Sequence, residues 1–463
     1  MGSQVGSFGS IPWFGSPPPP VIILDAIEWN REKYPVALSG YDRDTYDVDW
    51  GKSSYFPQTG ETAYYVDVAR PSNSGDGLSW ATAKKSIQNA ITAANAAGVP
   101  AVIYVRAGTY PREDGFTGAG GTVRSTVDTR FVAVDGRVVV WHGSNITDWT
   151  AGPSGTWVGS RAGVCGAIDP SRRDVLGNHP RFRRLANRAA VEASSGQDVY
   201  AQDGAFVVVK RADGSAISNS NVRCFIQNLG SAFRIGSVAN GKKISVEGFE
   251  FQGGSSDTVL VETAVRDVVV YFKEVISGYG GCDINAASMN GFGVNGGGLV
   301  VFERCQARGT TSDGFNFHWT PDASRSQFII SVDCVGRGHG VAEYGLSNNG
   351  YTAHETCVGI DIRGDYGYGR DGGTIANIGT TLWAMLGTIA GPQAPGPVTA
   401  VSFRTADSAK LYLVDADARI AGEQKLSLAP ADTSEIHVLR VGLGGGSIGG
   451  SGQVIPMVSV SLS

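Results

Sequence analysis

The chain has 463 residues, of which 65 are glycine and 17% are charged, and its formal net charge is −5. So few charges with an acidic balance argue against nucleic acid as a partner, because nucleic-acid-binding proteins usually carry a basic field. No run of 18 apolar residues is present, so we expect neither a transmembrane helix nor insertion into a membrane. The six cysteines are scattered without a Cys-x-x-Cys pair, which argues against a zinc site.

Residues 1–62 differ from the rest of the chain and are predicted to form an extended attachment segment. They start with a Gly/Ser-rich stretch that ends in four prolines, and they lack the charged start, apolar run and cleavage site of a signal peptide. An apolar island at residues 11–14 interrupts this stretch, and we interpret it as a docking peptide, the alternative being a plain linker. Residues 21–62 are rich in Tyr, Trp and Asp, and form either an adaptor or a cover over the first coil of the next domain.

The main domain is predicted to span residues 63–390 and to begin with a strand, a helix and a second strand. Residues 64–68 and 101–110 are rich in β-branched and aromatic side chains, as strands are. Between them, residues 82–97 place apolar side chains at helical spacing: Ala83, Ile87, Ala90, Ile91 and Ala94. Gly98 ends this helix and Pro100 follows it, as is common at the C-terminus of a helix.

Residues 126–243 are less regular and contain an arginine-rich stretch that we interpret as an excursion from the domain. Seven arginines occur between residues 161 and 188 against two aspartates: Arg161, Arg172, Arg173, Arg181, Arg183, Arg184 and Arg188. Guanidinium groups pair well with carboxylates and sulfates, so the stretch suits an acidic sugar polymer or a negatively charged partner subunit. The alternative is a solvated loop. Trp149 and Trp157 either stack on sugar rings or pack in the core.

A repeat organises residues 241–364. Five short β-rich runs follow one another, with the apolar positions Val246, Phe272, Phe302, Val332 and Ile362 at matching places in them. The first step is shorter than the other three, which are equal at about 30 residues, a period typical of stacked repeats. Such a coil cannot bury its apolar face alone, and stacking on its neighbours completes a continuous core. We therefore predict an all-β fold, a parallel β-helix in which these five residues form one inward column and the helix at 82–97 caps the open end. An α/β domain would need helices between the strands, and none is indicated.

The start of the domain resembles a known superfamily. After Tyr65-Val66-Asp67, residues 75–91 read Gly-Asp-Gly-Leu-Ser-Trp-Ala-Thr-Ala-Lys-Lys-Ser-Ile-Gln-Asn-Ala-Ile, and residues 103–110 read Ile-Tyr-Val-Arg-Ala-Gly-Thr-Tyr. This is similar to the start of right-handed parallel β-helix proteins of the pectate-lyase-like superfamily, which includes polysaccharide lyases, glycoside hydrolases, uronan epimerases and phage tailspikes. The resemblance covers residues 64–390 and implies the fold but not the reaction. The Asp-Pro-His-Asp motif of alginate epimerases is absent, which argues against that activity.

Three acids are predicted to form a ladder on one side of the helix. Asp283, Asp313 and Glu343 recur at the same step as the apolar positions, and equal register places neighbouring coils about 4.8 Å apart. Carboxyls this close shift each other's pKa apart, which suits the acid and base or nucleophile of glycoside hydrolysis. We therefore predict Asp313 and Glu343 as the catalytic pair, with Asp283 tuning them. We assign no metal ligands and no cofactor, although Ca²⁺ is an alternative use of these acids. A further alternative is that loop lengths break the register and leave the acids solvated.

Polar and aromatic residues surround these acids in the sequence. His318 and His354 are predicted to orient the substrate or to shuttle protons, as catalytic residues. If the reaction is elimination, a histidine base needs Arg337 or Arg363 to neutralise the uronate carboxylate. The full set of predicted substrate-binding residues is Arg337, Trp319, Tyr344, Asn349, Tyr351, Arg363 and Tyr368.

Residues 391–463 are predicted to form a small C-terminal β region. A Pro/Gly-rich run at 391–397 marks the boundary. The last residues form an apolar, alternating strand, which is an edge that subunit pairing would cover.

These features favour a virion tail protein, similar to a phage tailspike, that binds and depolymerises a host surface polysaccharide. We expect a homotrimer that contacts other tail proteins through residues 1–62. The first alternative is a secreted, extracellular bacterial lyase or glycoside hydrolase whose export signal has been removed. The second is a receptor protein that binds carbohydrate without catalysis.

Overall fold

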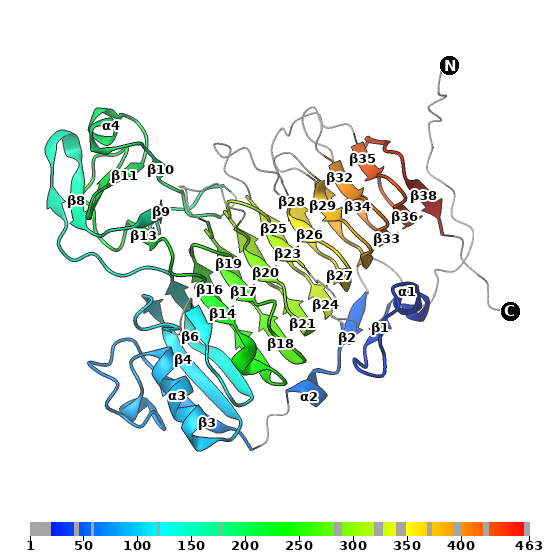
Figure 1. The fold of residues 1–463 in the computed structure, drawn as a ribbon, viewed down its shortest axis with the longest axis horizontal. Coiled ribbons are helices and arrows are strands. Elements are labelled where there is room, and N and C mark those ends of the chain that lie inside the picture. Colours follow the sequence, from blue (N-terminus) through cyan, green and yellow to red (C-terminus); the bar gives the residue numbers. More distant parts are fainter. Residues whose placement is uncertain are drawn as a thin grey trace.

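The chain winds into a right-handed parallel β-helix of about ten turns, which confirms the predicted fold class (Figure 1). The structure, a computed structural model, describes residues 20–40, 46–56, 60–117, 121–175, 177–281, 289–318, 327–338, 349–367, 373–391, 401–419 and 426–457. Among these residues, no helix combines the length and apolar character needed to cross a membrane.

Each full coil carries three short strands, which stack into three parallel sheets. Sheet 1 contains β15 (Lys243–Glu247), β18 (Val268–Lys273), β21 (Gly298–Glu303), β24 (Gln327–Val332), β27 (Val358–Ile362), β30 (Leu382–Leu386), β33 (Lys410–Val414), β36 (Glu435–Leu439) and β38 (Gln453–Pro456). Sheet 2 contains β16 (Phe249–Gln252), β19 (Ile276–Gly278), β22 (Gln306–Arg308), β25 (Val335–Arg337), β28 (Asp365–Gly367), β31 (Ile389–Gly391) and β34 (Asp417–Ala418). Sheet 3 contains β5 (Thr122–Val123), β14 (Phe233–Ile235), β17 (Val259–Val261), β20 (Phe292–Val294), β23 (Phe315–Phe317), β26 (Tyr351–Ala353), β29 (Gly373–Asn377), β32 (Val401–Thr405), β35 (Leu426–Pro430) and β37 (Ser447–Ile448).

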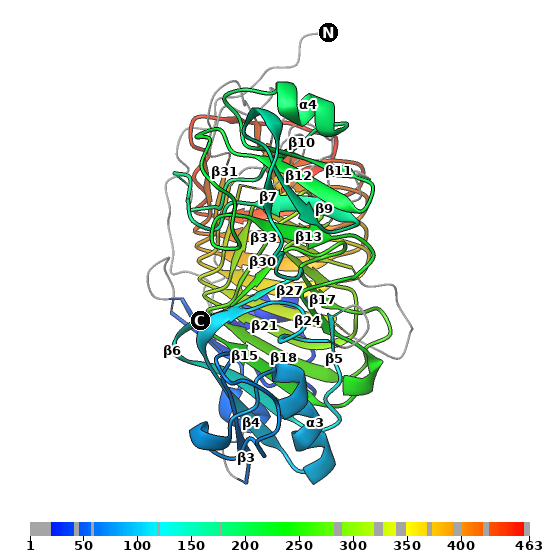
Figure 2. The same ribbon diagram turned by 90° about the vertical axis from the view of Figure 1, so that its left-hand side faces the viewer.

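The first coils and their cap match the prediction. Strands β3 (Thr62–Val66), β4 (Ala101–Tyr110) and β6 (Thr129–Trp141) pair in parallel, and α3 (Ile87–Ala97) lies beside β3 and β4 at this end (Figure 2). Ser86 begins α3 by accepting a hydrogen bond from the Asn89 amide, and Gly98 ends it in the left-handed conformation. The predicted apolar stripe is buried, so the helix covers the open end of the core.

The predicted inward column is wrong in its second half. Val246, Phe272 and Phe302 pair in register and are buried inside the coils. Phe302, however, pairs with Ser331 rather than Val332, because this coil is one residue shorter than the coil before it. A shift of one residue turns a side chain to the opposite face of a sheet. Val332 and its register partner Ile362 therefore pack on the outer face of sheet 1.

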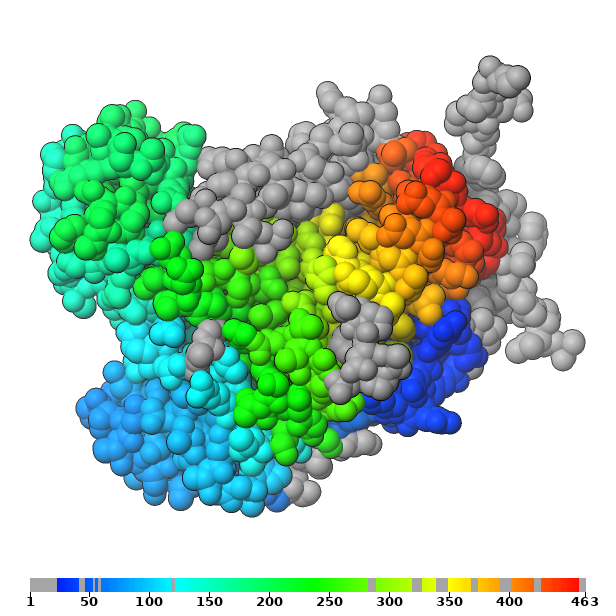
Figure 3. All heavy atoms as spheres, viewed as in Figure 1, coloured from blue at the N-terminus to red at the C-terminus, as the bar shows by residue number. Residues whose placement is uncertain are grey.

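That outer face is covered by residues 20–40 and 46–56, here called the N-terminal strap. It contains α1 (Pro20–Ala26), β1 (Ala37–Ser39), β2 (Asp47–Asp49) and α2 (Lys52–Tyr55). Its buried apolar side chains are Ile23, Leu24, Ile27, Trp29, Tyr34, Val36, Tyr46, Val48, Trp50 and Phe56. The Tyr46 hydroxyl lies 2.9 Å from Asp415 near the last coils, and Lys52 Nζ lies 2.8 Å from the Tyr271 hydroxyl in an early coil. The strap thus runs along the solenoid and covers several coils, not the first one (Figure 3).

The arginine-rich excursion, residues 142–232, forms a separate lobe beside the early coils (Figures 1 and 3). Its elements are β7 (Thr150–Ala151), β8 (Trp157–Ser160), β9 (Val164–Ile168), β10 (Arg183–Arg184), α4 (Arg188–Ala193), β11 (Val199–Asp203), β12 (Phe206–Lys210) and β13 (Arg223–Ile226). Trp149 and Trp157 pack against its apolar core, which favours packing over sugar stacking. Cys165 is disulfide-bonded, whereas Cys224, Cys305, Cys334 and Cys357 are buried thiols.

The predicted boundary at residues 390/391 is not a break in the fold. Strands β32 and β33 pair in register with β29 and β30 of the coil before. Strands β35 and β36 then continue sheets 3 and 1. The Pro/Gly-rich run lies mostly in the connection after β31, outside the described residues. Residues 401–419 and 426–457 therefore belong to the last coils of the same solenoid rather than to a separate region.

Candidate functional site

A ladder of aspartate and asparagine side chains runs along sheet 3. Asp257, Asn290, Asp313 and Asn349 each stand two residues before positions that pair in register. Each side-chain oxygen accepts the backbone N–H of the next rung: Asp257 from Asn290 at 2.8 Å, Asn290 from Asp313 at 3.1 Å, and Asp313 from Asn349 at 2.8 Å. These hydrogen bonds join four successive coils where the loops enter the sheet.

The ladder corrects the predicted register of the acids. The register partners of Asp313 are Asn290 and Asn349, which are 23 and 36 residues away, because the connections into sheet 3 vary in length. A constant interval in the sequence therefore does not identify neighbours in this sheet. Asp283 and Glu343 lie outside the described residues. The predicted ladder of three acids is replaced by a mixed one in which Asp257 is the second acid.

Both ladder acids have carboxyl groups that resist ionisation. Burial raises the pKa of Asp257 to about 6, and the negative charge of Asp313 acts in the same direction. Burial also raises the pKa of Asp313, while hydrogen bonds from the Asn349 amide and the Asn316 side chain oppose that shift. The positive charge of His318 lowers both pKa values, so it interacts electrostatically with both acids. Two acids and a histidine therefore share one face of the solenoid.

Gly293 leaves room for the Asp257 carboxyl on that face. Phe292 and Val294 point into the core, so residue 293 faces outward. A Cβ atom at this position would lie 1.9 Å from Asp257 Oδ2. The buried carboxyl of Asp257 thus packs against the outward side of β20, in space that any other residue at 293 would fill.

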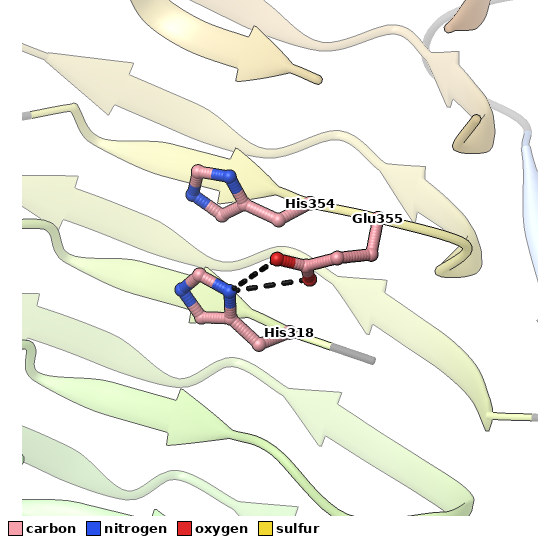
Figure 4. A group of neighbouring side chains, drawn as sticks. All are labelled: His318, His354 and Glu355. Carbon is pink, nitrogen blue, oxygen red and sulfur yellow. Dashed lines mark hydrogen bonds and ion pairs between the residues drawn. The ribbon is translucent and has the colours of Figure 1, made fainter. Parts of the chain in front are cut away.

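His318 and Glu355 form a hydrogen-bonded pair on the same sheet (Figure 4). His318 follows β23 and His354 follows β26, and their rings stack in parallel at 4.2 Å because Phe317 pairs with Ala353. His318 Nδ1 lies 3.1 and 3.2 Å from the two carboxylate oxygens of Glu355. The side chains of His318 and Glu355 are each 40% exposed. A ligand on this face can therefore reach the pair.

The pair sets the chemistry of the two imidazoles. Donation from Nδ1 of His318 to Glu355 leaves Nε2 as the nitrogen that accepts a proton. Burial lowers the pKa of His354 to about 4, and the charge of His318 adds to that effect. His354 is therefore neutral near pH 7 and does not repel a protonated His318.

The same three residues are the group of described side chains that could hold a metal ion, with ligating atoms within 4.8 Å of one another. A metal ion lies close to the plane of each imidazole that binds it. The planes of His318 and His354 are within 3° of parallel at 4.2 Å, so they share no such point. This geometry fits a hydrogen-bonded pair better than a metal centre.

The other predicted site residues are spread over the coil. Arg337 lies on sheet 2 and pairs with Asp365 at 2.6 Å. Arg363 lies at the turn between sheets 1 and 2 and pairs with Asp333 at 2.7 Å. Tyr351 is buried in the core, and Asn349 belongs to the ladder. Trp319, Tyr344 and Tyr368 lie outside the described residues. Of the predicted residues, sheet 3 brings Asp313 and Asn349 into hydrogen-bond contact and stacks His318 on His354.

Asp257 and Glu355 are the functional candidates that sequence reasoning missed. Asp257 lies outside the expected register, because the step from Asp257 to the next rung, Asn290, is 33 residues. Glu355 follows His354 directly, but its link to His318 depends on the long connection between β23 and β26. The sequence offered one signal for Glu355, which is that it directly follows the predicted site residue His354.

We expect Asp257→Asn to stabilise the protein at pH 8. The pKa of Asp257 is about 6 in the folded state and near 4 when unfolded, so the protonated carboxyl contributes to the stability of the fold. That contribution is complete below about pH 4 and is lost as the pH rises through 6. Asparagine retains the oxygen that accepts the Asn290 amide and removes a charge whose burial costs up to about 3 kcal/mol. Urea unfolding at pH 4 and pH 8 measures the effect. If the substitution changed the free energy of unfolding equally at pH 4 and pH 8, the raised pKa of Asp257 would be contradicted.

No family model matches the chain, and no curated protein matches it. Among solved structures, XylC in complex with xylose is similar over 84% of this chain and 70% of that chain, with 12% identity and a TM-score of 0.45. The pectate lyase Pel9A is similar over 80% and 79%, with 15% identity and a TM-score of 0.39. The gp54 tailspike of Acinetobacter baumannii bacteriophage AP22, in complex with a capsular saccharide, is similar over 80% and 67%, with 8% identity and a TM-score of 0.25. These similarities are too distant to transfer a reaction, and the assignment as a right-handed parallel β-helix rests on the chain's own strand pairing.

Proposed function

We propose that the protein binds a polysaccharide across the outer face of sheet 3 and hydrolyses it there. The observation that carries this proposal is the half-exposed His318–Glu355 pair on the same face as two acids with raised pKa values. Ionisable groups whose environments push their pKa values apart are typical of catalytic sites. The rigid solenoid holds these groups in fixed register across neighbouring coils.

Each residue has a defined role in this reaction. Glu355 accepts a hydrogen bond from the Nδ1–H of His318. Nε2 of His318 is then free to take a proton from the attacking water. Asp257, whose pKa is raised to about 6, carries a proton in mildly acidic solution and gives it to the departing glycosidic oxygen. Asp313 remains in its ladder hydrogen bonds and acts through its charge on Asp257. His318 gains the proton that the water loses, and Asp257 loses the proton that the glycosidic oxygen gains. Exchange with solvent then returns both residues to their starting state.

The assembly that we propose for this activity is a homotrimer on a virion tail, and the proposal rests on the apolar sequence at both ends of the chain. Most of the predicted attachment segment is already used within this chain, because residues 20–40 and 46–56 pack on sheet 1 as the N-terminal strap. Contact with other tail proteins would then depend on residues 1–19, which lie outside the described residues. A secreted bacterial enzyme and a binding protein without catalysis are the competing assignments.

The test is to incubate the protein with a panel of capsular and exopolysaccharides and to measure the size and end groups of the products. We expect shorter chains with new reducing ends and no double bond. Products with unsaturated uronic ends would replace hydrolysis by elimination. Tight binding with no change in polymer length would leave carbohydrate binding as the function.

A further inference from the structure

Three guanidinium groups lie within electrostatic range of one buried carboxylate, that of Glu250, where the excursion meets sheet 2, and their charge is poorly balanced. Arg173 comes from the excursion, Arg223 begins β13 and Arg308 ends β22. We propose that Arg173, Arg223 and Arg308 form a binding subsite for the carboxylate or sulfate group of an acidic saccharide. The inference rests on the proposed function for the polymeric nature of the ligand, and it adds the substrate class.

The geometry brings two of these groups to a single oxygen. Arg173 Nη1 and Arg308 Nη1 both donate to the Gly177 carbonyl, at 2.6 and 2.9 Å. Arg223 Nη1 donates to Gln252 Oε1 at 2.5 Å. Gln252, Gly278 and Arg308 occupy equal register on three successive coils. Because Gly278 has no side chain, no side chain of this row separates Arg308 from Gln252 and its partner Arg223.

The charge balance of the cluster favours an anion. The three arginines donate to carbonyl, amide and hydroxyl oxygens, which are neutral. Within the described residues, Arg223 and Arg308 have no carboxylate within 4 Å, and Arg173 has Glu250 at 3.8 Å. Three positive charges therefore face one buried carboxylate, and Gln252 already donates to that carboxylate at 2.6 Å. A carboxylate or sulfate is the group that guanidinium pairs hold best.

Solvent access and electrostatics support the same conclusion. The Arg173 side chain is 44% exposed, so the cluster opens to solvent from the excursion side. Burial lowers the pKa of Arg223, and it lowers the pKa of Arg308, where the charge of Arg173 adds to the effect. A bound anion would offset that repulsion. The subsite lies on sheet 2 and the His318–Glu355 pair on sheet 3, so it would hold the polymer away from the point of cleavage.

The experiment measures binding of three probes to the full chain by calorimetry: oligogalacturonate, sulfated dextran and unmodified dextran. We expect at least one acidic probe to bind more tightly than unmodified dextran. Arg308→Gln and Arg223→Gln should each weaken that binding by about 10- to 100-fold, the range of one charge-assisted hydrogen bond. Glu250→Gln should strengthen it, because it removes the opposing charge and leaves the arginines in place. The matched control is Arg304→Gln, which removes a guanidinium from the same coil as Arg308, where it pairs with Glu274 at 2.8 Å.

Each outcome decides the proposal. Preference for one acidic probe identifies carboxylate or sulfate as the recognised group. Acidic probes that bind no better than unmodified dextran, or that bind equally to Arg308→Gln, Arg223→Gln and Arg304→Gln, would overturn the subsite. Arginine-dependent self-association without probe binding would also overturn it, in favour of a contact between subunits. Arginine-dependent binding without cleavage of any polymer would leave the subsite standing while the proposed hydrolysis fails.

Discussion

His318→Gln is expected to reduce polymer turnover by about 10²- to 10⁴-fold, which is the range for loss of a general base. Glutamine removes the proton-accepting Nε2 while retaining a polar side chain at the end of β23. Glu355→Gln is expected to cause a smaller loss and to change the pH dependence of turnover, because it removes the carboxylate that holds the Nδ1 proton. Initial rates of reducing-end formation, measured from pH 4 to pH 9, test both variants.

His437→Gln is the matched control for these variants. His437 also pairs with a glutamate, Glu435 at 2.8 Å, but it lies on sheet 1 and stacks on Tyr412. The control is expected to retain wild-type turnover. If His318→Gln folds and keeps near wild-type turnover on a polymer that the protein cleaves, His318 is not the base and the proposed mechanism fails.

Trp29→Ala should lower the free energy of unfolding by about 3–5 kcal/mol, the usual cost of truncating a buried tryptophan. Trp29 is 6% exposed, and its ring lies 4.6 Å from that of Phe328 on β24. Its indole N–H donates to the Tyr34 carbonyl at 3.1 Å. Loss of this side chain weakens the strap where it crosses the middle coils, and denaturant unfolding with hydrogen exchange at β24 measures the effect.

Phe206→Ala provides the control for the strap. Phe206 is 46% exposed on β12, so its truncation should change stability by no more than about 0.5 kcal/mol. If Trp29→Ala matches this control and β24 remains protected from exchange, the strap does not contribute to stability and sheet 1 must be covered in another way.

The solenoid was predictable because sheet 1 repeats its apolar runs at nearly constant spacing. The core positions Val246, Phe272 and Phe302 follow that spacing and lie inside. The prediction failed at Val332 because a coil one residue shorter reverses which side chains face inward. Both faces of sheet 1 are apolar here, since the strap covers the outer one, so composition did not reveal the change of face.

The site was less predictable because its geometry depends on the connections into sheet 3. His318 and His354 were identified as proton-transfer candidates from their residue type, and the structure stacks their rings. Their partner Glu355 and the second acid Asp257 depend on ladder steps of 36 and 33 residues, which no local pattern encodes. Arg337 and Arg363 were assigned to sugar binding by proximity in sequence, but a three-sided coil places nearby residues on different faces.

A crystal structure of His318→Gln with a bound oligosaccharide, taken from a polymer that the wild type cleaves, tests the central claim most directly. We predict a sugar chain across the outer face of sheet 3, over Gly293. We also predict a glycosidic oxygen within hydrogen-bond reach of Asp257, about 2.6–3.2 Å. An oligosaccharide bound at full occupancy on another face, with none near Asp257 or residue 318, would contradict both.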